Sequence, residues 1–281
     1  MKVLFTLTSA ESRKLIAKGV IASEPFKRAW KNAYVIFAGG TTNGVILQEL
    51  PGGEKIDPAG STFGITADGV ICLTAAEDRV NFTRVWYKGQ PSQKSVQEAL
   101  REQNPDTIAI KGGNAIDAEG NVGVLTASNN GGTVSAFYGS VVAQGLTMLM
   151  PVGLEKLIPS VPAAAKACKA RDVDVAMGSI ASMFCFGEAT PITEIEALNI
   201  LFGVQATLVA AGGTGDSAGA VTLLCEGTEE AVNGLIQFLE KEIKGAPAIQ
   251  GRKGLCRECT IKQCRYYGME EEAFPWKTSR N

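Results

Sequence analysis

Short apolar runs alternate with segments of helical periodicity along most of this chain. Such runs, each ending in a turn or a helix start, lie at residues 3–7, 34–38, 107–110 and 146–151. Helical patterns begin near Ser9, Val45 and Val161. Because strands and helices alternate, the pattern predicts an α/β domain whose sheet is largely parallel and covered by helices.

The order of elements changes after about residue 175. A strand, a helix, two strands and a final helix that Thr228 caps follow one another as far as about residue 248. This order predicts a smaller ferredoxin-like α+β domain. We therefore expect an α/β domain over residues 1–175, the α+β domain over residues 176–248 and a Cys-containing tail over residues 249–281.

Composition narrows the class of protein. With 281 residues, 45% hydrophobic and 20% charged, the chain can form one large domain or two smaller ones. The 27 basic and 29 acidic residues give a net charge of -2, so we expect no nucleic-acid partner and no attraction to an anionic membrane. The first apolar run is too short for a signal sequence or a membrane span, and a cytoplasmic location is expected.

The chain contains no histidine. This excludes Ser-His-Asp and Cys-His catalytic machinery and His-ligated zinc. Acid-base chemistry therefore has to use Asp, Glu, Lys, Cys or Tyr side chains.

The stretch "AGGTTNG" links the second apolar run to a helix. Glycine amides, a helix N-terminus and threonine hydroxyls suit a phosphate or carboxylate group. A plain strand-to-helix turn explains the same residues, and both interpretations stay open. The expected ligand-binding residues here are Gly39, Gly40, Thr41, Thr42 and Asn43.

A second glycine-rich exit, "IKGGNAIDAEGNVGVL", follows the third apolar run. A hairpin with an acidic tip accounts for Asp117 and Glu119 but not for the flexible exit, which favours a nearby ligand. The exit adds four expected ligand-binding residues: Lys111, Gly112, Gly113 and Asn114. Asp117 and Glu119 are candidate general bases.

Residues 106–168 resemble the lactate-utilisation (LUD) domains. The segments "KGGNAIDAEGNVG", "NNGGTVSAFYG" and "TMLMPVGLEKLIPSVPAAAKA" occur in the order typical of that family. The resemblance implies a NagB/RpiA/CoA-transferase-like fold that binds a sugar phosphate, a CoA ester or a similar anionic metabolite. It adds Glu155 as a candidate catalytic residue, although a solvated charge at a helix start is the favoured explanation of Glu155. The acid-base loop of ribose-5-phosphate isomerase has no counterpart here, so catalysis stays an open question.

Three cysteines lie close together in the tail, in "LCRECTIKQC". Cys256, Cys259 and Cys264 could ligate zinc or an iron-sulfur cluster, although a closed site would need a fourth cysteine from elsewhere. The alternative is a set of free or redox-active thiols whose pKa nearby basic residues lower.

The glycine-rich stretch "AAGGTGDSAGAV", residues 210–221, is most simply a long hairpin loop. Alternatively it could cover the site of the first domain. We therefore expect a protein that binds a small anionic metabolite, either as an isomerase- or transferase-like enzyme or as a non-catalytic binding protein. An accessory redox protein that uses the tail cysteines is the third alternative, and a homo-oligomer is an open expectation.

Overall fold

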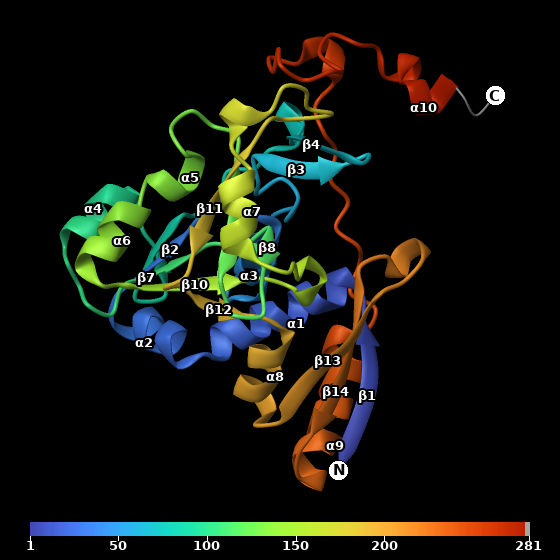
Figure 1. Ribbon diagram of the computed structural model, residues 1–281. Coiled ribbons are helices and arrows are strands. Elements are labelled where there is room, and N and C mark those ends of the chain that lie inside the picture. The colour runs from blue at the N-terminus through green and yellow to red at the C-terminus, as the bar shows by residue number, and fades with distance from the viewer. Residues whose placement is uncertain (279–281) are drawn as a thin grey trace.

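The computed structural model describes residues 1–278 and shows a mixed α/β protein (Figure 1). Its largest sheet has six strands in the order β12-β10-β7-β2-β5-β6. These strands are β2 (Tyr34–Phe37), β5 (Val85–Tyr87), β6 (Gln90–Pro91), β7 (Ile108–Ile110), β10 (Thr147–Pro151) and β12 (Thr190–Ile192). β2, β7, β10 and β12 are parallel, and β5 and β6 add an antiparallel edge. The sheet is therefore mixed, and four of its six strands form the parallel part that was expected.

Both faces of this sheet are buried because alternate side chains of the parallel strands enter different clusters. One face packs against α1 (Ser9–Ala22), α2 (Glu24–Asn32) and α3 (Thr41–Glu49). The other packs against α4 (Val96–Arg101), α5 (Gly132–Ser135), α6 (Tyr138–Gln144) and a second sheet. That second sheet has the order β11-β9-β8, with β8 (Ala115–Ile116), β9 (Val122–Thr126) and β11 (Ser182–Phe186).

The third sheet combines the two ends of the sequence. β1 (Lys2–Leu7) pairs with β14 (Ala220–Glu226), which also pairs with β13 (Gln205–Gly212). α8 (Glu194–Phe202) and α9 (Glu229–Phe238) join the same hydrophobic cluster as these strands. The boundary expected near residue 175 is therefore crossed by strand pairing.

The ferredoxin-like arrangement expected for residues 176–248 is wrong in its strand membership. β11 pairs with β9 and β12 pairs with β10, so neither belongs to the small sheet. Its third strand is β1 instead. The local pattern predicted one strand before α8, where the structure has two, β11 and β12, and it gave the following helix, two strands and helix correctly. A pattern of this kind carries no information about which distant strands pair.

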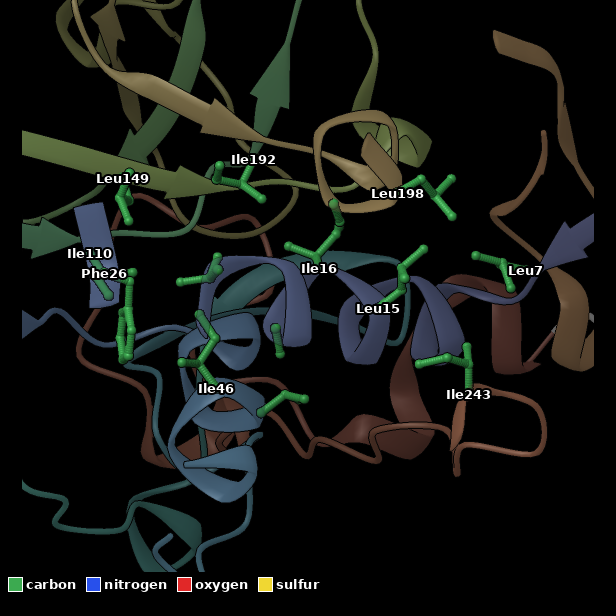
Figure 2. Packing of buried hydrophobic residues seen from close by; sticks show 14 of the residues in the cluster. Leu7, Leu15, Ile16, Phe26, Ile46, Ile110, Leu149, Ile192, Leu198 and Ile243 are labelled. Atoms are coloured by element: carbon green, nitrogen blue, oxygen red, sulfur yellow. The ribbon is translucent and has the colours of Figure 1, made fainter. Parts of the chain in front are cut away.

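Helix α1 connects the small sheet to the large one. Its start is fixed by a capping box in which Thr8 and Glu11 exchange hydrogen bonds. Figure 2 shows Leu15 and Ile16 of α1 between Ile46 of α3 and Leu198 of α8. Each of these side chains is fully buried, which stabilises the fold by about 1.5–3 kcal/mol per residue. α1 thus fixes the positions of α3 and α8 relative to each other.

The remaining segments are a short hairpin, helix α7 and the tail. β3 (Gly64–Ala67) and β4 (Val70–Leu73) form the hairpin expected around Asp68-Gly69. α7 (Val161–Ala167) follows β10, and the tail runs beside the hairpin to α10 (Pro275–Thr278) (Figure 1). The tail expected over residues 249–281 is described to residue 278, and its last residues lie outside the described part. None of the helices in residues 1–278 has the length and apolar character needed to cross a membrane.

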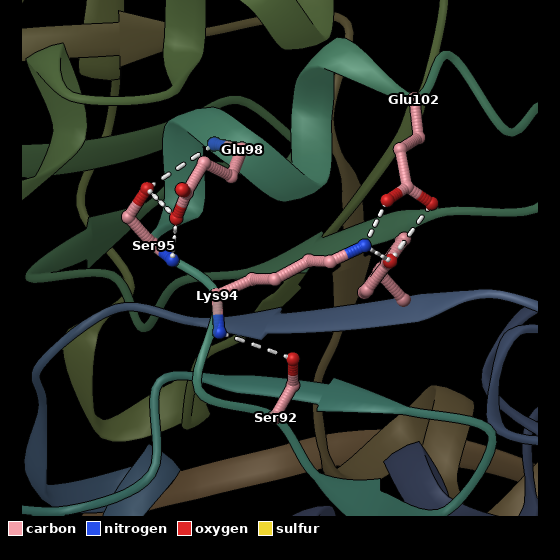
Figure 3. Close-up of polar contacts among 6 residues, drawn as sticks. Ser92, Lys94, Ser95, Glu98 and Glu102 are labelled. Carbon is pink, nitrogen blue, oxygen red and sulfur yellow. Dashed lines mark hydrogen bonds and ion pairs between the residues drawn. The ribbon is translucent and has the colours of Figure 1, made fainter.

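Replacing Tyr34 with phenylalanine tests how α4 is fixed to β2. The Tyr34 hydroxyl donates to Glu102 Oε2 and accepts from Lys94 Nζ, both at 2.8 Å, and Lys94 also pairs with Glu102 (Figure 3). Loss of the hydroxyl is expected to lower the free energy of unfolding by about 1 kcal/mol, measured by urea denaturation. Tyr267→Phe, at an exposed position, is the control and should have little effect. Equal stability of Tyr34→Phe and the wild type would contradict this role.

Candidate functional site

Four loops meet where the parallel strands end. They follow Phe37, Ile110, Pro151 and Ile192. Phe37 pairs with Ile110 and Pro151 with Ile192, and Pro151 lies two residues beyond the partner of Ile110. Main-chain hydrogen bonds connect the loops: Ala38 N donates to Ile110 O, and Val152 N donates to Ile192 O. In open α/β sheets this carboxyl edge is the usual position of a ligand site.

Five charged side chains gather at this edge, and we call them the charged cluster. They come from the second turn of α1, from the loops after β7 and β10, and from the first residue of α8: Arg13, Lys111, Glu155, Lys156 and Glu194. The cluster contains three cations and two carboxylates, so one positive charge is left uncompensated when all five groups are ionised.

Glu155 lies between two of the cations. Its Oε1 atom is 3.8 Å from Nη2 of Arg13 and 3.7 Å from Nζ of Lys156. Both carboxylate oxygens are buried and accept no hydrogen bond from residues 1–278, and the buried Nε of Arg13 makes none within the same residues. The expectation of a solvated Glu155 is therefore wrong, because the carboxylate packs against the Cα of Gly153, where a Cβ would lie 1.8 Å from Oε2. Buried polar atoms without a hydrogen-bond partner are few in native proteins, and a bound water, an ion or a functional role commonly explains them.

The lysines are poorly solvated and lie near each other. Burial lowers the pKa of Lys111 to about 8, and the charge of Lys156 contributes to the shift. Burial also lowers the pKa of Lys156, and Arg13 lowers it further, against the opposing effect of Glu155. Their ammonium groups donate to main-chain oxygens, Lys111 to Gly112 at 2.9 Å and Lys156 to Gly113 at 3.2 Å.

Glu194 is shifted in the opposite direction. It is completely buried, and burial together with the charge of Glu155 raises its pKa to about 7. Oε2 accepts a hydrogen bond from Leu154 N at 2.9 Å, whereas Oε1 has no hydrogen-bond partner within residues 1–278. A lysine and a glutamate that both titrate near neutrality can exchange protons with a ligand.

The "AGGTTNG" turn lies at the same edge, and the structure accounts for part of it without a ligand. A Cβ on Gly39 would lie 2.9 Å from Ser61 O, and Gly40 N donates to Ser61 O. Asn43 is buried and donates to Ala38 O and Ile110 O, which joins β2 to β7, and Thr42 is buried beside it. Thr41 is half-buried at the start of α3, which no side chain in residues 1–278 caps. This uncapped start is the part of the turn that still suits an anion.

The structure also accounts for part of the loop after β7 without a ligand. Gly113 is required for packing, because a Cβ there would lie 2.4 Å from Cγ1 of Val122, and its N–H donates to Pro151 O. Gly112 has ordinary space around it. Asn114 is exposed, and its Oδ1 accepts from Leu125 N. Lys111 is thus the residue of this loop that belongs to the charged cluster.

Asp117 and Glu119 lie in the turn between β8 and β9. Asp117 is buried, and its oxygens accept from the amides of Glu119 and Val161 and from the amide and side chain of Asn121. Burial raises its pKa, but these hydrogen bonds outweigh burial and lower it overall. The geometry gives Asp117 the role of fixing the turn and the start of α7. Glu119 is exposed at the tip, and general-base roles for the two remain predictions without support from their geometry.

The glycine-rich hairpin between β13 and β14 reaches the charged cluster. A Cβ on Gly219 would lie 3.9 Å from Cβ of Glu155. This places the loop beside the site, as one of the two interpretations of its sequence requires. A separate cavity of about 710 Å³ lies instead along the edge strand β12, between α8 and β13.

Sequence reasoning missed Arg13, Lys156 and Glu194. Each lies near the start of a helix, where a charged side chain is usually solvated. The only sign in the sequence that they belong to a site was their position after apolar runs. Cys256, Cys259 and Cys264 lie in the tail, with Cys256 buried and the others half-buried. As the side chains stand, no three Cys, Asp or Glu groups in residues 1–278 are placed to hold a metal ion.

Comparison of the chain with protein-family models, with curated proteins and with solved structures finds no match in any of the three.

Proposed function

We propose that the charged cluster binds the phosphate or carboxylate group of a small metabolite. The observation that carries this proposal is the pair Lys111 and Lys156, whose ammonium groups lie near each other and donate to main-chain carbonyl oxygens. Lys156 also has the carboxylates of Glu155 and Glu194 nearby. Two partly buried cations repel each other, and an anion between them would relieve that repulsion. The uncapped start of α3, at the same edge, would add amide donors.

The NagB/RpiA-like architecture belongs to this proposal. Its support is the set of parallel strands β2, β7, β10 and β12, which are adjacent in sheet order and present their loops at one edge. Sugar phosphates and CoA esters are therefore the metabolite classes to test first.

Proton transfer to or from the bound metabolite is the second candidate function. It is favoured by the opposite pKa shifts of Lys111 and Glu194, which bring a base and an acid near neutrality in one cluster. In this role neutral Lys111 accepts a proton and protonated Glu194 donates one. A binding protein without turnover would use the same cations.

A ligand screen tests the binding proposal. Wild-type protein should gain thermal stability from at least one class among sugar phosphates, CoA species and small carboxylates, by about 3 kcal/mol at 100 times the dissociation constant. Lys111→Met and Lys156→Met should each weaken binding about 10- to 100-fold, because a charge-assisted hydrogen bond is lost. Lys166→Met, at an exposed position of α7, is the control and should bind normally.

The pH dependence of binding adds a second readout. A bound anion raises the pKa of Lys111 above about 8, so the complex holds a proton that the free protein loses. Affinity for an anion of constant charge should therefore fall as the pH rises above 8, and Lys111→Met should flatten that decline. Stabilisation by none of the three classes, or equal binding by the two methionine variants and the control, would exclude the proposal.

A further inference from the structure

The tail is attached to the β3–β4 hairpin by main-chain contacts. Thr74 and Lys253 form an antiparallel bridge, and Gly254 N donates to Leu73 O at 3.0 Å. Further along the tail, Cys264 forms a parallel bridge with Ala176. These contacts determine where the tail cysteines lie relative to β4.

A fourth cysteine joins the three of the tail at this place. Cys72 of β4 and Cys264 pack against the small buried cluster that contains Cys256. Cys72 also directly precedes Leu73 and Thr74, whose main chains contact the tail at Gly254 and Lys253. We call these residues the cysteine cluster: Cys72, Cys256, Cys259 and Cys264. The sequence alone indicated only a small buried side chain at position 72.

Two of the sulfurs already accept main-chain hydrogen bonds. Ile261 N donates to Cys259 Sγ at 3.3 Å, and Tyr266 N donates to Cys264 Sγ at 3.4 Å. In both cases the donor is two residues after the cysteine. Bonds from main-chain N–H groups to sulfur are typical of the supporting contacts around metal-bound sulfur.

A buried cation accompanies the sulfurs. Lys253 is only 3% exposed, and its Nζ lies 3.9 Å from Cys256 Sγ. It also pairs with Glu271 and lies over the ring of Phe274. A buried ammonium is costly unless negative charge surrounds it, and a group of thiolates would supply that charge.

The tail has a small core of its own. Its described elements after residue 249 are short 3₁₀ turns and the four-residue α10, and its buried apolar side chains are Cys256, Tyr266 and Phe274. Segments with so small a core commonly depend on a structural metal.

We infer that the cysteine cluster is a four-thiolate site for a thiophilic metal, either a zinc ion or an iron-sulfur cluster. Cys72 supplies the fourth ligand that the tail lacks, and the metal would fasten the tail to the hairpin. On binding, the thiols would release their protons and the sulfurs would have to move together, because as the side chains stand no three Cys, Asp or Glu groups in residues 1–278 are placed to hold a metal ion. This inference is independent of the charged cluster and its ligand.

Metal analysis of the full chain, purified without oxygen or chelator, is the first test. We expect about one zinc per chain, or iron together with acid-labile sulfide, and the two results distinguish the occupants. Cys72→Ser and Cys259→Ser should each lose most of the metal. Cys185→Ser, at an exposed position in β11, should keep it.

Two further readouts separate ligand loss from misfolding. Cobalt(II) added to metal-free protein should give the charge-transfer absorption of thiolate coordination, weaker in Cys72→Ser than in Cys185→Ser. Chelation should speed tryptic cleavage at the exposed Lys262 and Arg265, while the circular dichroism of the main sheets stays unchanged.

Three results would overturn the inference. The first is that the wild-type protein contains no metal and gives no charge-transfer absorption with cobalt. The second is a disulfide within the cysteine cluster in protein purified without oxygen. The third is full metal content in a folded Cys72→Ser variant.

Discussion

Replacing Glu194 with glutamine is expected to remove most of the loss of stability that the wild-type protein shows between pH 5 and pH 8. The pKa of Glu194 is about 7 in the folded protein, against an ordinary value of 4.5. Between these values the folded state holds a proton that the unfolded state has lost, so stability falls as the pH rises. The shift corresponds to about 3 kcal/mol as an upper value, because each unit is worth about 1.4 kcal/mol.

Lys111 reverses the trend at higher pH. Its pKa is about 8 in the folded protein and 10.5 in its ordinary state, so stability rises again as the pH increases through that interval. The wild-type protein should therefore have a stability minimum near pH 7–8. The charge of Glu155 acts on Glu194 and that of Lys156 acts on Lys111, while Arg13 and Glu155 act in turn on Lys156.

Urea denaturation at pH 5, 6, 7 and 8 measures the effect. Glutamine keeps the oxygen that accepts from Leu154 N, so the fold should be preserved. Glu240→Gln, at an exposed position, is the control and should follow the wild-type curve. A Glu194→Gln variant whose stability declines with pH as steeply as the wild type would refute the assignment of the buried charge.

Replacing Gly19 with alanine should cost about 2–3 kcal/mol of stability, although alanine is the better helix former. Gly19 of α1 faces Ala197 of α8, and a Cβ at position 19 would lie 2.5 Å from Cβ and 2.7 Å from Cα of Ala197. The second distance involves main chain, so the helices would have to separate. Because Arg13 and Glu194 belong to these helices, their positions in the charged cluster would change as well.

Gly234→Ala in α9 is the matched control. A Cβ at that position meets nothing within 4 Å, so alanine should stabilise the protein by about 0.5–1 kcal/mol. Gly19→Ala combined with Ala197→Gly should recover part of the lost stability, since one of the two close contacts disappears. Equal effects of the two single alanine substitutions would show that the α1–α8 distance is not a constraint.

The elements that depend on local pattern were predictable from the sequence. The strands at residues 34–37, 108–110 and 147–151 and the hairpin around Asp68-Gly69 are confirmed, as is the cap of α9 by Thr228. The helix expected from Val45 starts earlier, at Thr41, because the glycine turn is shorter than the pattern indicates. Continuous apolar runs were sufficient for the strands, the Asp-Gly turn for the hairpin and the Thr228 position for the helix cap.

The site was only partly predictable, because it depends on contacts between distant segments. Lys111 and Glu155 were found through a turn and a resemblance, whereas Arg13 and Glu194 come together only through the packing of α1 against α8. Gly39 and Gly113 stood out in the sequence as ligand-binding glycines, yet Ser61 and Val122 leave no space for a Cβ there. Close packing and close approach of a ligand select the same residue type, so sequence alone could not separate them.

The pairing of β1 with β14 has a consequence for how the chain reaches its folded state. The two strands join residues 2–7 to residues 221–226, so β1 stays without its neighbour until most of the polypeptide has left the ribosome. Such a distant closure raises the contact order and slows the last step of folding. During synthesis the apolar residues of β1 are therefore exposed to chaperones or to aggregation, and the charged cluster cannot assemble until α8 and the final hairpin arrive.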